Sequence, residues 1–274
     1  MFFGLNKIFN KAWCGCALLA IAGLASAPDL FAANRIVAWG DITYDVVLTG
    51  DAAPPQRAGV LQISSGNFHS IALSSFGNVL AWGDNRFGQT SVPELLQRSA
   101  ATQITAGNIH NLALTREGTV VGWGPMPGQV GDYGQCEVPP GLGHVAAIAA
   151  GAVHSLALTS GGTVAAWGLN MSGQCNVPAG LNGVISVAGG MYHSLALRAD
   201  GTVVAWGDNR QGQTSIPPGL SNVVAIAASG FHNVALLANG TVVTWGTYGL
   251  AQMNVPPGLS NVVAIATGDY HTLA

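Results

Sequence analysis

Residues Val184–Leu220 read VISVAGGMYHSLALRADGTVVAWGDNRQGQTSIPPGL, and this stretch decides the fold. After a β-branched run and two glycines, His193–Leu197 alternates large and small side chains, which is the period of a half-buried strand. Asp200-Gly201 follows and is a strong hairpin signal, because a type I′ turn needs positive φ at both central residues. The return strand ends at Trp206. We therefore predict three short antiparallel strands, with a fourth in the polar stretch around the next Gly-Gln.

The same unit recurs along the whole chain. Each histidine precedes the next tryptophan by 13 positions, as from His193 to Trp206, whereas the interval from tryptophan to the next histidine ranges from 26 to 31. A repeat of about 40 residues with several short strands is typical of a propeller blade. We predict an all-β β-propeller of ~39-residue four-stranded blades. The recurrent residues are Trp39, Trp82, Trp123, Trp167, Trp206 and Trp245, and His69, His110, His154, His193, His232 and His271.

These motifs resemble a known repeat. Gly-x-x-His-Ser-Leu-Ala-Leu, then Asp-Gly-Thr-Val-Val-Ala-Trp-Gly, then Asn-x-x-Gly-Gln is similar to the repeat of the regulator of chromosome condensation family. The linker Val-Pro-Pro-Gly-Leu at Val255–Leu259 resembles the bacterial secreted branch of that family. The resemblance runs from about Arg35 to Ala274 and implies a propeller, normally of seven blades. It implies little about function, because one fold serves unrelated functions.

The two ends of the repeat region leave the blade number open. The region opens with a lone return strand, Arg35–Gly40, and stops within a strand at His271–Ala274. These two half-blades could pair and close a six-bladed ring. A strand that ends unpaired exposes an edge that proteins usually avoid. We therefore favour the alternative, in which the chain is a fragment and ~40 further residues complete a seventh blade.

Residues 1–33 have the composition of an export leader. Lys7 and Lys11 give a positive start, and Ala17–Ala27 is an uninterrupted small and apolar run, which is the length of a signal-peptide core. A spanning helix needs ~20 apolar residues, more than this stretch offers. We expect cleavage after Ala27, or after one of the alanines at 32 and 33, and predict a secreted, periplasmic or cell-surface protein. An uncleaved anchor is the alternative.

The composition of the remaining domain, 34–274, bounds its partners. The chain has 274 residues, of which 49% are apolar and 8% charged, so it can bury a large core and disorder is not expected. The formal net charge is −3, and no lysine follows Lys11. A nucleic-acid binder needs a basic surface. We therefore expect no nucleic-acid partner and, once the leader is cleaved, no membrane span.

The recurrent histidines and tryptophans are predicted to be structural, because a catalytic group is needed once per site and a structural group once per repeat. We expect each imidazole to bond nearby backbone and each tryptophan to pack between blades. Equivalent positions on separate blades do not converge to the ~2.0–2.1 Å of a zinc–nitrogen bond. The loops at 83–90 and 207–214 mimic a phosphate loop but carry glutamine where its lysine would stand. We expect no metal site, no cofactor and no enzymatic activity.

Three other reactive side chains lie in the repeat region. Cys136 and Cys175 both follow Gly-Gln, so they occupy equivalent places on neighbouring repeats. Such places usually lie further apart than the ~5.5 Å between Cα atoms that a disulfide needs, so we expect buried free thiols, with a bridge as the alternative. His144 stands outside the repeat pattern and is expected at the surface.

Length variation between repeats falls after Trp-Gly and indicates where binding should be sought. The extra residues lie at Ile42–Ala53, around Glu94–Gln103 and at Pro125–Tyr133. Loops tolerate change on a rigid scaffold, and Tyr and Arg are favoured at interface hot spots. Solvated loop residues without a role are the alternative for each candidate. The candidates for partner binding are Tyr44, Asp45, Arg86, Arg98, Tyr133 and Arg210.

Together these features predict a secreted, non-enzymatic repeat scaffold that binds a protein or a cell-surface polymer through its variable loops. A secreted enzyme inhibitor is one form of this, because a bacterial β-lactamase inhibitor is similar in fold. The alternative is guanine-nucleotide exchange with chromatin binding, as in the family's namesake. The leader and the lysine-free body argue against it. An enzyme whose catalytic residues lie beyond Ala274 is a third possibility.

Overall fold

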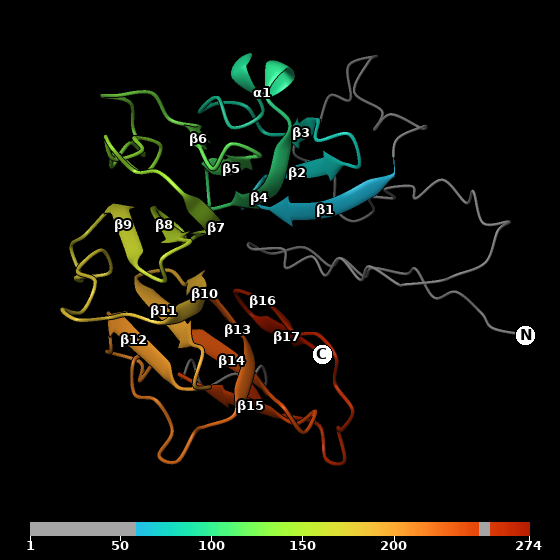
Figure 1. Ribbon diagram of the computed structural model, residues 1–274, viewed down its shortest axis with the longest axis vertical. Coiled ribbons are helices and arrows are strands. Elements are labelled where there is room, and N and C mark those ends of the chain that lie inside the picture. The colour runs from blue at the N-terminus through green and yellow to red at the C-terminus, as the bar shows by residue number, and fades with distance from the viewer. Residues whose placement is uncertain (1–58, 247–252) are drawn as a thin grey trace, which may run out of the picture.

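The computed structural model describes residues 59–246 and 253–274, and these form one antiparallel sheet per repeat (Figure 1). Five sheets have three strands in chain order and the sixth has two. The strands are β1 Val60–Ser65, β2 His69–Ser74, β3 Val79–Gly83, β4 Ala101–Ala106, β5 Asn111–Thr115, β6 Val120–Trp123, β7 Val145–Ala150, β8 His154–Thr159, β9 Val164–Gly168, β10 Val184–Gly189, β11 His193–Arg198, β12 Val203–Gly207, β13 Val223–Ser229, β14 His232–Leu237, β15 Val242–Trp245, β16 Ala266–Gly268 and β17 His271–Leu273.

The predicted all-β repeat fold is confirmed, but the predicted fourth strand is wrong for the described repeats. The polar stretch after Trp-Gly forms turns instead. In the repeat that starts at β7, Gly173 has a φ of 80° and the Asn170 carbonyl side chain accepts the backbone N–H of Cys175 at 2.9 Å. The left-handed glycine bends the chain, and the asparagine removes a donor that a strand ladder would need. Five of the described sheets therefore have three strands, and the last has two.

The first strand of each sheet lies innermost, and successive sheets are arranged around a shared central space (Figure 1). The inner strands β1, β4, β7, β10, β13 and β16 contact one another in that order. Their alanine-rich sequences suit this crowded position near the axis. The half-blade at Arg35–Gly40 lies outside the described residues, so the blade number and the closure of the ring stay predictions.

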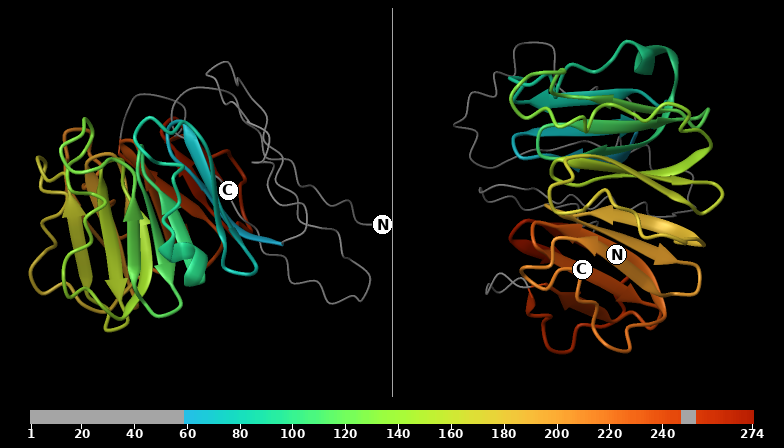
Figure 2. Two further views of the ribbon diagram at one scale, coloured as in Figure 1. Left: turned by 90° about the horizontal axis from the view of Figure 1, so that it is seen from above. Right: turned by 90° about the vertical axis from the view of Figure 1, so that its left-hand side faces the viewer.

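The strands run between two ends of the fold, which Figure 2 shows above and below them in its left-hand view. The loop face carries the Gly-x-x turns between first and second strands together with the loops after Trp-Gly. His193 pairs with Gly207 there, and the Asp208 N–H donates to the Tyr192 carbonyl at 2.9 Å. The hairpin face carries the tight turns between second and third strands. A tight hairpin forms there, as the Asp-Gly signal predicted, but only Gly201 has a positive φ, at 79°, so the expected type I′ geometry is not adopted.

One set of hydrogen bonds recurs at the junctions between repeats. The Gln174 main-chain carbonyl accepts Ser194 Oγ at 2.9 Å and Trp206 Nε1 at 2.8 Å, both from the next repeat. Its own side-chain Oε1 accepts the N–H of Ser172 at 2.9 Å and so closes the loop that presents it. Equivalent bonds join each of the other described Gly-Gln segments to the next repeat, through Gln89, Gln135 and Gln213. The buried loop carbonyls are thereby satisfied by side chains rather than by a strand.

The recurrent histidines also join repeats, which corrects the expectation that they bond nearby backbone. His154 Nε2 lies 3.0 Å from Ser194 Oγ of the next repeat. A β-carbon on Gly151 would collide with the His154 ring, so the imidazole fills the space over that glycine. Its Nδ1 is buried without a hydrogen-bond partner in the described part of the chain. The partners of the five histidines before the last are Asn111, Ser155, Ser194, Asn233 and Thr272.

Burial keeps these imidazoles neutral. Loss of hydration lowers the pKa of His110 and of His154 to about 3, with a smaller contribution from the neighbouring histidines. Loss of hydration also lowers the pKa of His193 to about 4, although its bond to Asn233 opposes the shift. His271 has no described repeat after it and is exposed. The recurrent histidines are thus structural, as their repetition predicted, but their role is to couple one blade to the next.

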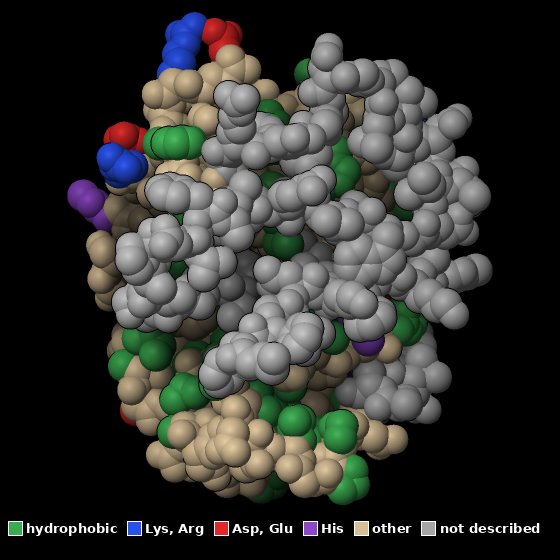
Figure 3. Space-filling view, turned by 90° about the vertical axis from the view of Figure 1, so that its right-hand side faces the viewer, with side chains coloured by type: hydrophobic (Ala, Val, Ile, Leu, Met, Phe, Trp, Pro, Cys, Tyr) green, Lys and Arg blue, Asp and Glu red, His purple; other side chains and the backbone are tan. Residues whose placement is uncertain are grey.

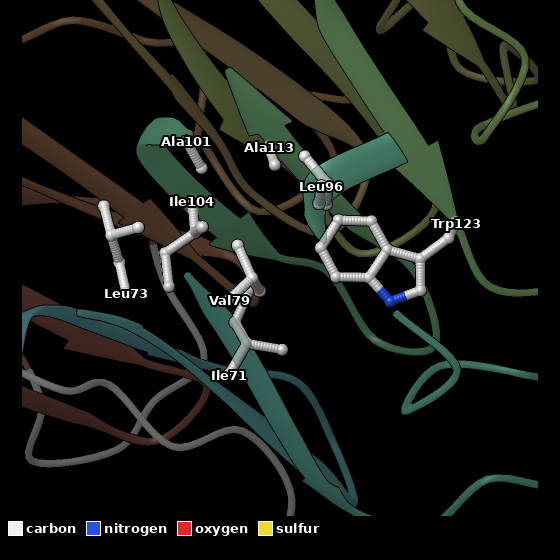
Figure 4. Close-up of a cluster of buried hydrophobic side chains, with 8 residues drawn as sticks. All are labelled: Ile71, Leu73, Val79, Leu96, Ala101, Ile104, Ala113 and Trp123. Atoms are coloured by element: carbon white, nitrogen blue, oxygen red, sulfur yellow. The ribbon is translucent and has the colours of Figure 1, made fainter. Parts of the chain in front are cut away.

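The tryptophans pack between repeats, as predicted. Trp123 contacts Ile71 and Val79 of the preceding repeat, and Figure 4 shows its indole facing this cluster. Leu96 belongs to the same cluster and lies in the short helix α1, Leu95–Arg98. This helix was not predicted, because the sequence shows no helical periodicity. The insertion in this repeat gives the chain room for one helical turn, and burial of Leu96 holds that turn in place.

The first two junctions carry an additional contact at the inner strands. Gln62 Nε2 donates to the Ile104 carbonyl at 2.8 Å, and Gln62 Oε1 accepts the Ile104 N–H at 3.0 Å. Gln103 bonds Ile148 in the same way, at 3.1 and 2.9 Å. Each glutamine amide therefore forms with an isoleucine main chain the same pair of hydrogen bonds that a neighbouring strand would form. The equivalent positions in the later repeats hold Ala147, Ser186 and Ala225.

The remaining reactive side chains have structural explanations. Cys136 and Cys175 are free and half-buried. Burial raises the pKa of Cys136 to about 12 and that of Cys175 to about 11, which keeps both as thiols. His144 is exposed, as predicted, and has a φ of 54°. It occupies the left-handed position just before an inner strand where later repeats place asparagines, Asn222 and Asn261.

Candidate functional site

A cavity of about 300 Å³ lies on the axis where the inner strands end at the loop face. Its rim is built of the Gly-x-x turns, which are tied to one another by main-chain bonds. The Asn67 N–H donates to the Asn108 carbonyl at 3.1 Å, and the Asn108 N–H donates to the Ala152 carbonyl at 2.9 Å. The same bonding continues from Ala152 to Gly190 at 3.1 Å and from Met191 to Gly230 at 2.8 Å. The rim of the cavity is therefore held by the scaffold and not by loose loops.

The polarity of the cavity wall differs from one repeat to the next. The first two repeats contribute hydroxyl and amide groups, among them Ser64, Asn67 and Asn108. The third and fourth repeats contribute alanines and Met191. The last described repeat contributes Thr267 and Asp269, and Asp269 is the single carboxylate among the lining residues. A ligand in this cavity would meet one charged group on one side.

Asp269 is partly buried at this site. Its Oδ1 accepts Ser229 Oγ at 3.0 Å, and the Gly230 N–H also donates to its carboxylate. Burial raises the pKa of Asp269, while those two bonds and the nearby His271 oppose the rise. Sequence reasoning missed this residue. The available signal was its position, because Asp269 stands where the other repeats place Asn67, Asn108, Ala152, Met191 and Gly230.

An apolar or aromatic side chain directly follows a cavity-lining turn residue in every described repeat, at the position just before the recurrent histidine, but none of these side chains lines the cavity itself. Tyr192 and Phe231 are ring neighbours, with centroids 6.4 Å apart and planes at 59°. Phe68 and Tyr270 are about half exposed. The sequence alone shows this recurrence of apolar and aromatic residues, which the prediction of binding residues did not use. The full set is Phe68, Ile109, Val153, Tyr192, Phe231 and Tyr270.

Three of the predicted candidates lie on the loop face, each in a different repeat. Arg86 and Arg210 occupy equivalent loop positions, and each is tied to an aspartate two residues earlier. Arg210 Nε is 2.9 Å from Asp208 Oδ1, and Arg86 Nε is 3.0 Å from Asp84 Oδ1. The hydrogen bond from Arg210 lowers the pKa of Asp208, which is nearly buried while the arginine stays exposed. These arginines are held in place by their own loops.

Tyr133 is the third candidate on this face, and its loop is folded by its own bonds. Asp132 accepts the N–H groups of Gly128 and Gly134, each at 2.9 Å. The Tyr133 N–H donates to Gln135 Oε1 at 2.7 Å. The Tyr133 side chain is 49% exposed, and Met126 and Val130 of the same loop are exposed as well. This loop presents apolar surface without a partner in the described part of the chain.

The other candidates are not brought to this site. Arg98 pairs with Glu94 at the end of α1, three positions before Ala101. The Ala101 N–H donates to the Gly77 carbonyl at 2.9 Å, and Gly77 lies in a turn of the hairpin face. Arg98 is therefore near the opposite end of the fold. Tyr44 and Asp45 lie outside the described residues.

Charge distinguishes the two faces. In the described residues, five acids lie on the loop face against two arginines, Arg86 and Arg210, which leaves an acidic excess. The hairpin side carries balanced charges, for example Arg116 beside Glu117 and Arg198 near Asp200. In Figure 3, blue and red side chains lie next to one another at the upper left of the described surface. The acids of the loop face are Asp84, Asp132, Glu137, Asp208 and Asp269.

Two negative findings apply to residues 59–246 and 253–274. No three His, Cys, Asp or Glu side chains gather there as metal ligands would. No helix in these ranges is long and apolar enough to cross a membrane.

Comparison with known proteins supports the repeat assignment. A family model described as "Regulator of chromosome condensation (RCC1) repeat" matches residues 60–89, 145–174, 184–213 and 223–247. No curated protein matches the chain by sequence.

Several solved structures are similar to the chain. Prp20p from Saccharomyces cerevisiae is 24% identical with a TM-score of 0.62, over 74% of this chain and 61% of Prp20p. The ectodomain of the Physcomitrella patens receptor kinase CR4 is 22% identical with a TM-score of 0.63, over 81% of this chain and 59% of that one. Human WBSCR16 is 23% identical with a TM-score of 0.59, over 76% and 66%. The chain thus spans less than two thirds of these proteins, and the likeness shows the fold.

Partners are recorded for one of these neighbours. Prp20p has binding properties to Gsp1p and histones, and Kap60 is bound to yeast RCC1 (Prp20) in a further structure.

Proposed function

Because this chain is built of regulator of chromosome condensation repeats that form a β-propeller, we propose that it is a secreted, non-enzymatic scaffold that binds a protein through its loop face. The observation that carries the proposal is the contrast within each repeat. The junction bonds recur almost unchanged in four places, whereas the loop that presents Tyr133 resembles no other described loop. Rigid frames with one divergent surface are suited to recognition.

The absence of enzymatic activity is part of the proposal and rests on how the titratable groups are used. The buried histidines are neutral and engaged at the junctions, and Asp84 and Asp208 hold the loop arginines. Catalytic acids and bases instead need access to a substrate and a pKa near the working pH. Neither the junction histidines nor these aspartates meet that requirement.

A protein partner is favoured over a surface polymer on two grounds. The exposed Tyr133, Met126 and Val130 offer the aromatic and apolar anchors typical of protein interfaces. Prp20p, which shares the fold, binds proteins. Export is proposed from the leader-like residues 1–33 and from the lack of lysine in the rest of the chain.

A cross-linking experiment tests the binding face. A photo-reactive phenylalanine analogue replaces Tyr133 in one variant and Glu117, on the hairpin face, in a matched control. Each variant is mixed with the extracellular and surface proteins of the producing cell and irradiated. We expect one protein to be cross-linked from position 133 and not from position 117. Equal cross-linking from both positions, or none from 133, contradicts the proposal.

Two further readouts separate the alternatives. N-terminal sequencing of the mature protein should begin shortly after residue 27 or 33, whereas a cytoplasmic protein with an intact start contradicts export. The identity of the cross-linked protein then matters. A secreted hydrolase whose activity falls on binding indicates an inhibitor. A small GTPase whose nucleotide release accelerates indicates the exchange function of the family's namesake and overturns the proposal.

A further inference from the structure

We propose that the axial cavity receives a lysine or arginine side chain from a basic segment of the partner protein, with Asp269 as its counter-ion. The inference rests on the proposed function, because it names the chemistry of the partner that the loop face binds. It adds a central anchoring site to the loop contacts around Tyr133.

The size and place of the cavity suit a single inserted side chain. Its volume of about 300 Å³ is at the lower limit for ligand pockets, which run from about 300 to 1,000 Å³. It lies at the centre of the loop face, and its rim is held by the main-chain bonds that join Asn67, Asn108 and Ala152. A side chain that enters such a rim is anchored at little cost in ordering the protein.

Asp269 has acceptor capacity left for a cation. An ionised carboxylate offers about four acceptor sites, and here Ser229 and Gly230 each supply one donor. Within residues 59–246 and 253–274, neither lysine nor arginine forms an ion pair with it; the nearby titratable group is His271. The two hydrogen bonds replace only part of the hydration that burial removes from this carboxylate. An incoming ammonium or guanidinium group would restore this interaction.

Aromatic side chains directly follow cavity-lining residues in the sequence, although none of them lines the cavity itself. Tyr270 directly follows Asp269, and Phe231 directly follows Gly230, which lines the cavity. Tyr192 packs against Phe231. Aromatic faces attract ammonium and guanidinium groups, by about 0.5–1 kcal/mol at exposed sites and more where water is excluded.

Charge over the wider face indicates a basic protein segment rather than a lone cation. Both arginines of the loop face are bound to their own aspartates, whereas Asp132, Glu137 and Asp269 have no such cation in the described part of the chain. Asp269 lines the cavity, and Asp132 and Glu137 lie in one loop of the same face, so the three acids would attract a segment with several basic residues.

The test uses the mature chain and two labelled probes. Fluorescence anisotropy measures binding of fluorescein-labelled octa-arginine and octa-glutamate peptides at physiological salt. We expect octa-arginine to bind and octa-glutamate not to bind. Asp269→Asn should weaken octa-arginine at least tenfold, because asparagine keeps an oxygen for Ser229 and Gly230 but loses the charge. Circular dichroism and thermal melting check that this variant is folded.

A matched control isolates the cavity from general charge. Glu137→Gln removes one exposed acid from the same face and should change octa-arginine binding by less than threefold. Equal weakening by both variants, no effect of Asp269→Asn, or equal binding of octa-glutamate overturns the inference. Displacement of octa-arginine by spermine at the same molar charge overturns the choice of a protein segment and indicates a free polyamine.

The two proposals can fail separately. If cross-linking from position 133 succeeds and Asp269→Asn has no effect, the cavity inference is wrong and the binding face stands. If cross-linking from 133 fails, the proposed function falls regardless of how octa-arginine binds.

Discussion

The junctions between repeats and the loop face are built from the same 40-residue unit, yet they differ in almost every respect that matters for function. At the junctions, tryptophan, histidine and the Gly-Gln carbonyl meet in the same way from one repeat to the next. On the loop face, the segment after Trp-Gly holds an Asp–Arg pair in two repeats, an apolar Met171 in another and a longer, nine-residue loop at 125–133 in a fourth.

This difference shows how a repeat protein divides its work. A residue that recurs in every repeat answers a requirement that recurs in every repeat, which is to join one blade to the next. A binding site is needed once, so it is found where the repeats depart from one another. Asp269 illustrates this, because it is the one acid among the equivalent turn positions of the described repeats.

Acid should destabilise the junctions between repeats, because their histidines are buried in neutral form. The resulting fall in the free energy of unfolding is the largest effect that we expect. Burial lowers the pKa of His110 and His154 to about 3 and that of His193 to about 4. Unfolded histidine titrates near 6.5, so below that pH the unfolded chain binds more protons and stability falls as the pH falls. At about pH 5 each of the three histidines lowers the free energy of unfolding by about 2 kcal/mol relative to about pH 7.5.

Urea unfolding across this pH range measures the loss, which should level off near pH 3 to 4 as the folded chain itself takes up protons. His154→Gln provides the control. It should weaken the protein at neutral pH but remove about 2 kcal/mol of the acid-dependent loss. A stability that does not change between about pH 7.5 and about pH 5 would show that the imidazoles are not buried in neutral form.

Truncating a junction tryptophan is expected to have the next largest effect. Trp206→Ala removes the indole that packs between two repeats and a donor to the Gln174 carbonyl. Such changes cost about 3–5 kcal/mol, whereas Trp206→Phe should cost less because most of the packing remains. Met171→Ala, at an exposed loop position, should stay within about 0.5 kcal/mol. Urea unfolding of the three variants checks this order. If Met171→Ala lowered the free energy of unfolding as much as Trp206→Ala, junction and loop residues would not differ in their contribution to stability.

The inner-strand glutamines allow the stability of the early junctions to be compared with that of the later ones. Gln103→Ala removes two hydrogen bonds to Ile148 and should cost about 1–2 kcal/mol. Ser186→Ala, at the equivalent position two repeats later, should cost less than about 0.5 kcal/mol. Unfolding measurements on both variants decide whether the early junctions are the stronger ones. Equal losses would mean that the amide bonds contribute nothing net.

The smallest effect on stability is expected from the candidate binding residue. Tyr133→Ala removes an exposed ring whose contacts are not part of any junction, so the free energy of unfolding should change by less than about 0.5 kcal/mol. Thermal melting measures this. A loss of more than about 2 kcal/mol would place Tyr133 among the structural residues instead.

The sequence predicted the parts of the fold that depend on periodicity and turn chemistry. Alternation after His193, the Asp200-Gly201 turn and the fixed spacing to Trp206 gave three strands and the packing of tryptophan between blades. The fourth strand was wrongly expected, because the side chains that capture the loop's backbone donors become evident only when the turn is folded. The histidine partners were missed for a related reason, since they lie in the next repeat.

The candidate site was less predictable than the fold. Loop composition correctly placed Arg86, Tyr133 and Arg210 on one face, but Arg98 was grouped with them although its segment runs on to the hairpin face. Asp269 has no motif of its own, and its significance depends on six turns meeting around one axis. The six turns meet because successive repeats pack around one axis, and no local sequence pattern records this.

Exchanging one loop tests the division between frame and binding surface most directly. Residues 125–133 are replaced by the four residues 169–172, which connect the equivalent glycines in the next repeat. The dissociation constant of this variant is then measured for the protein that cross-links from position 133. We predict that binding weakens by about a hundredfold, because a loop with exposed Tyr133, Met126 and Val130 is lost while every junction bond remains. An unchanged dissociation constant would contradict the assignment of binding to the divergent loop face.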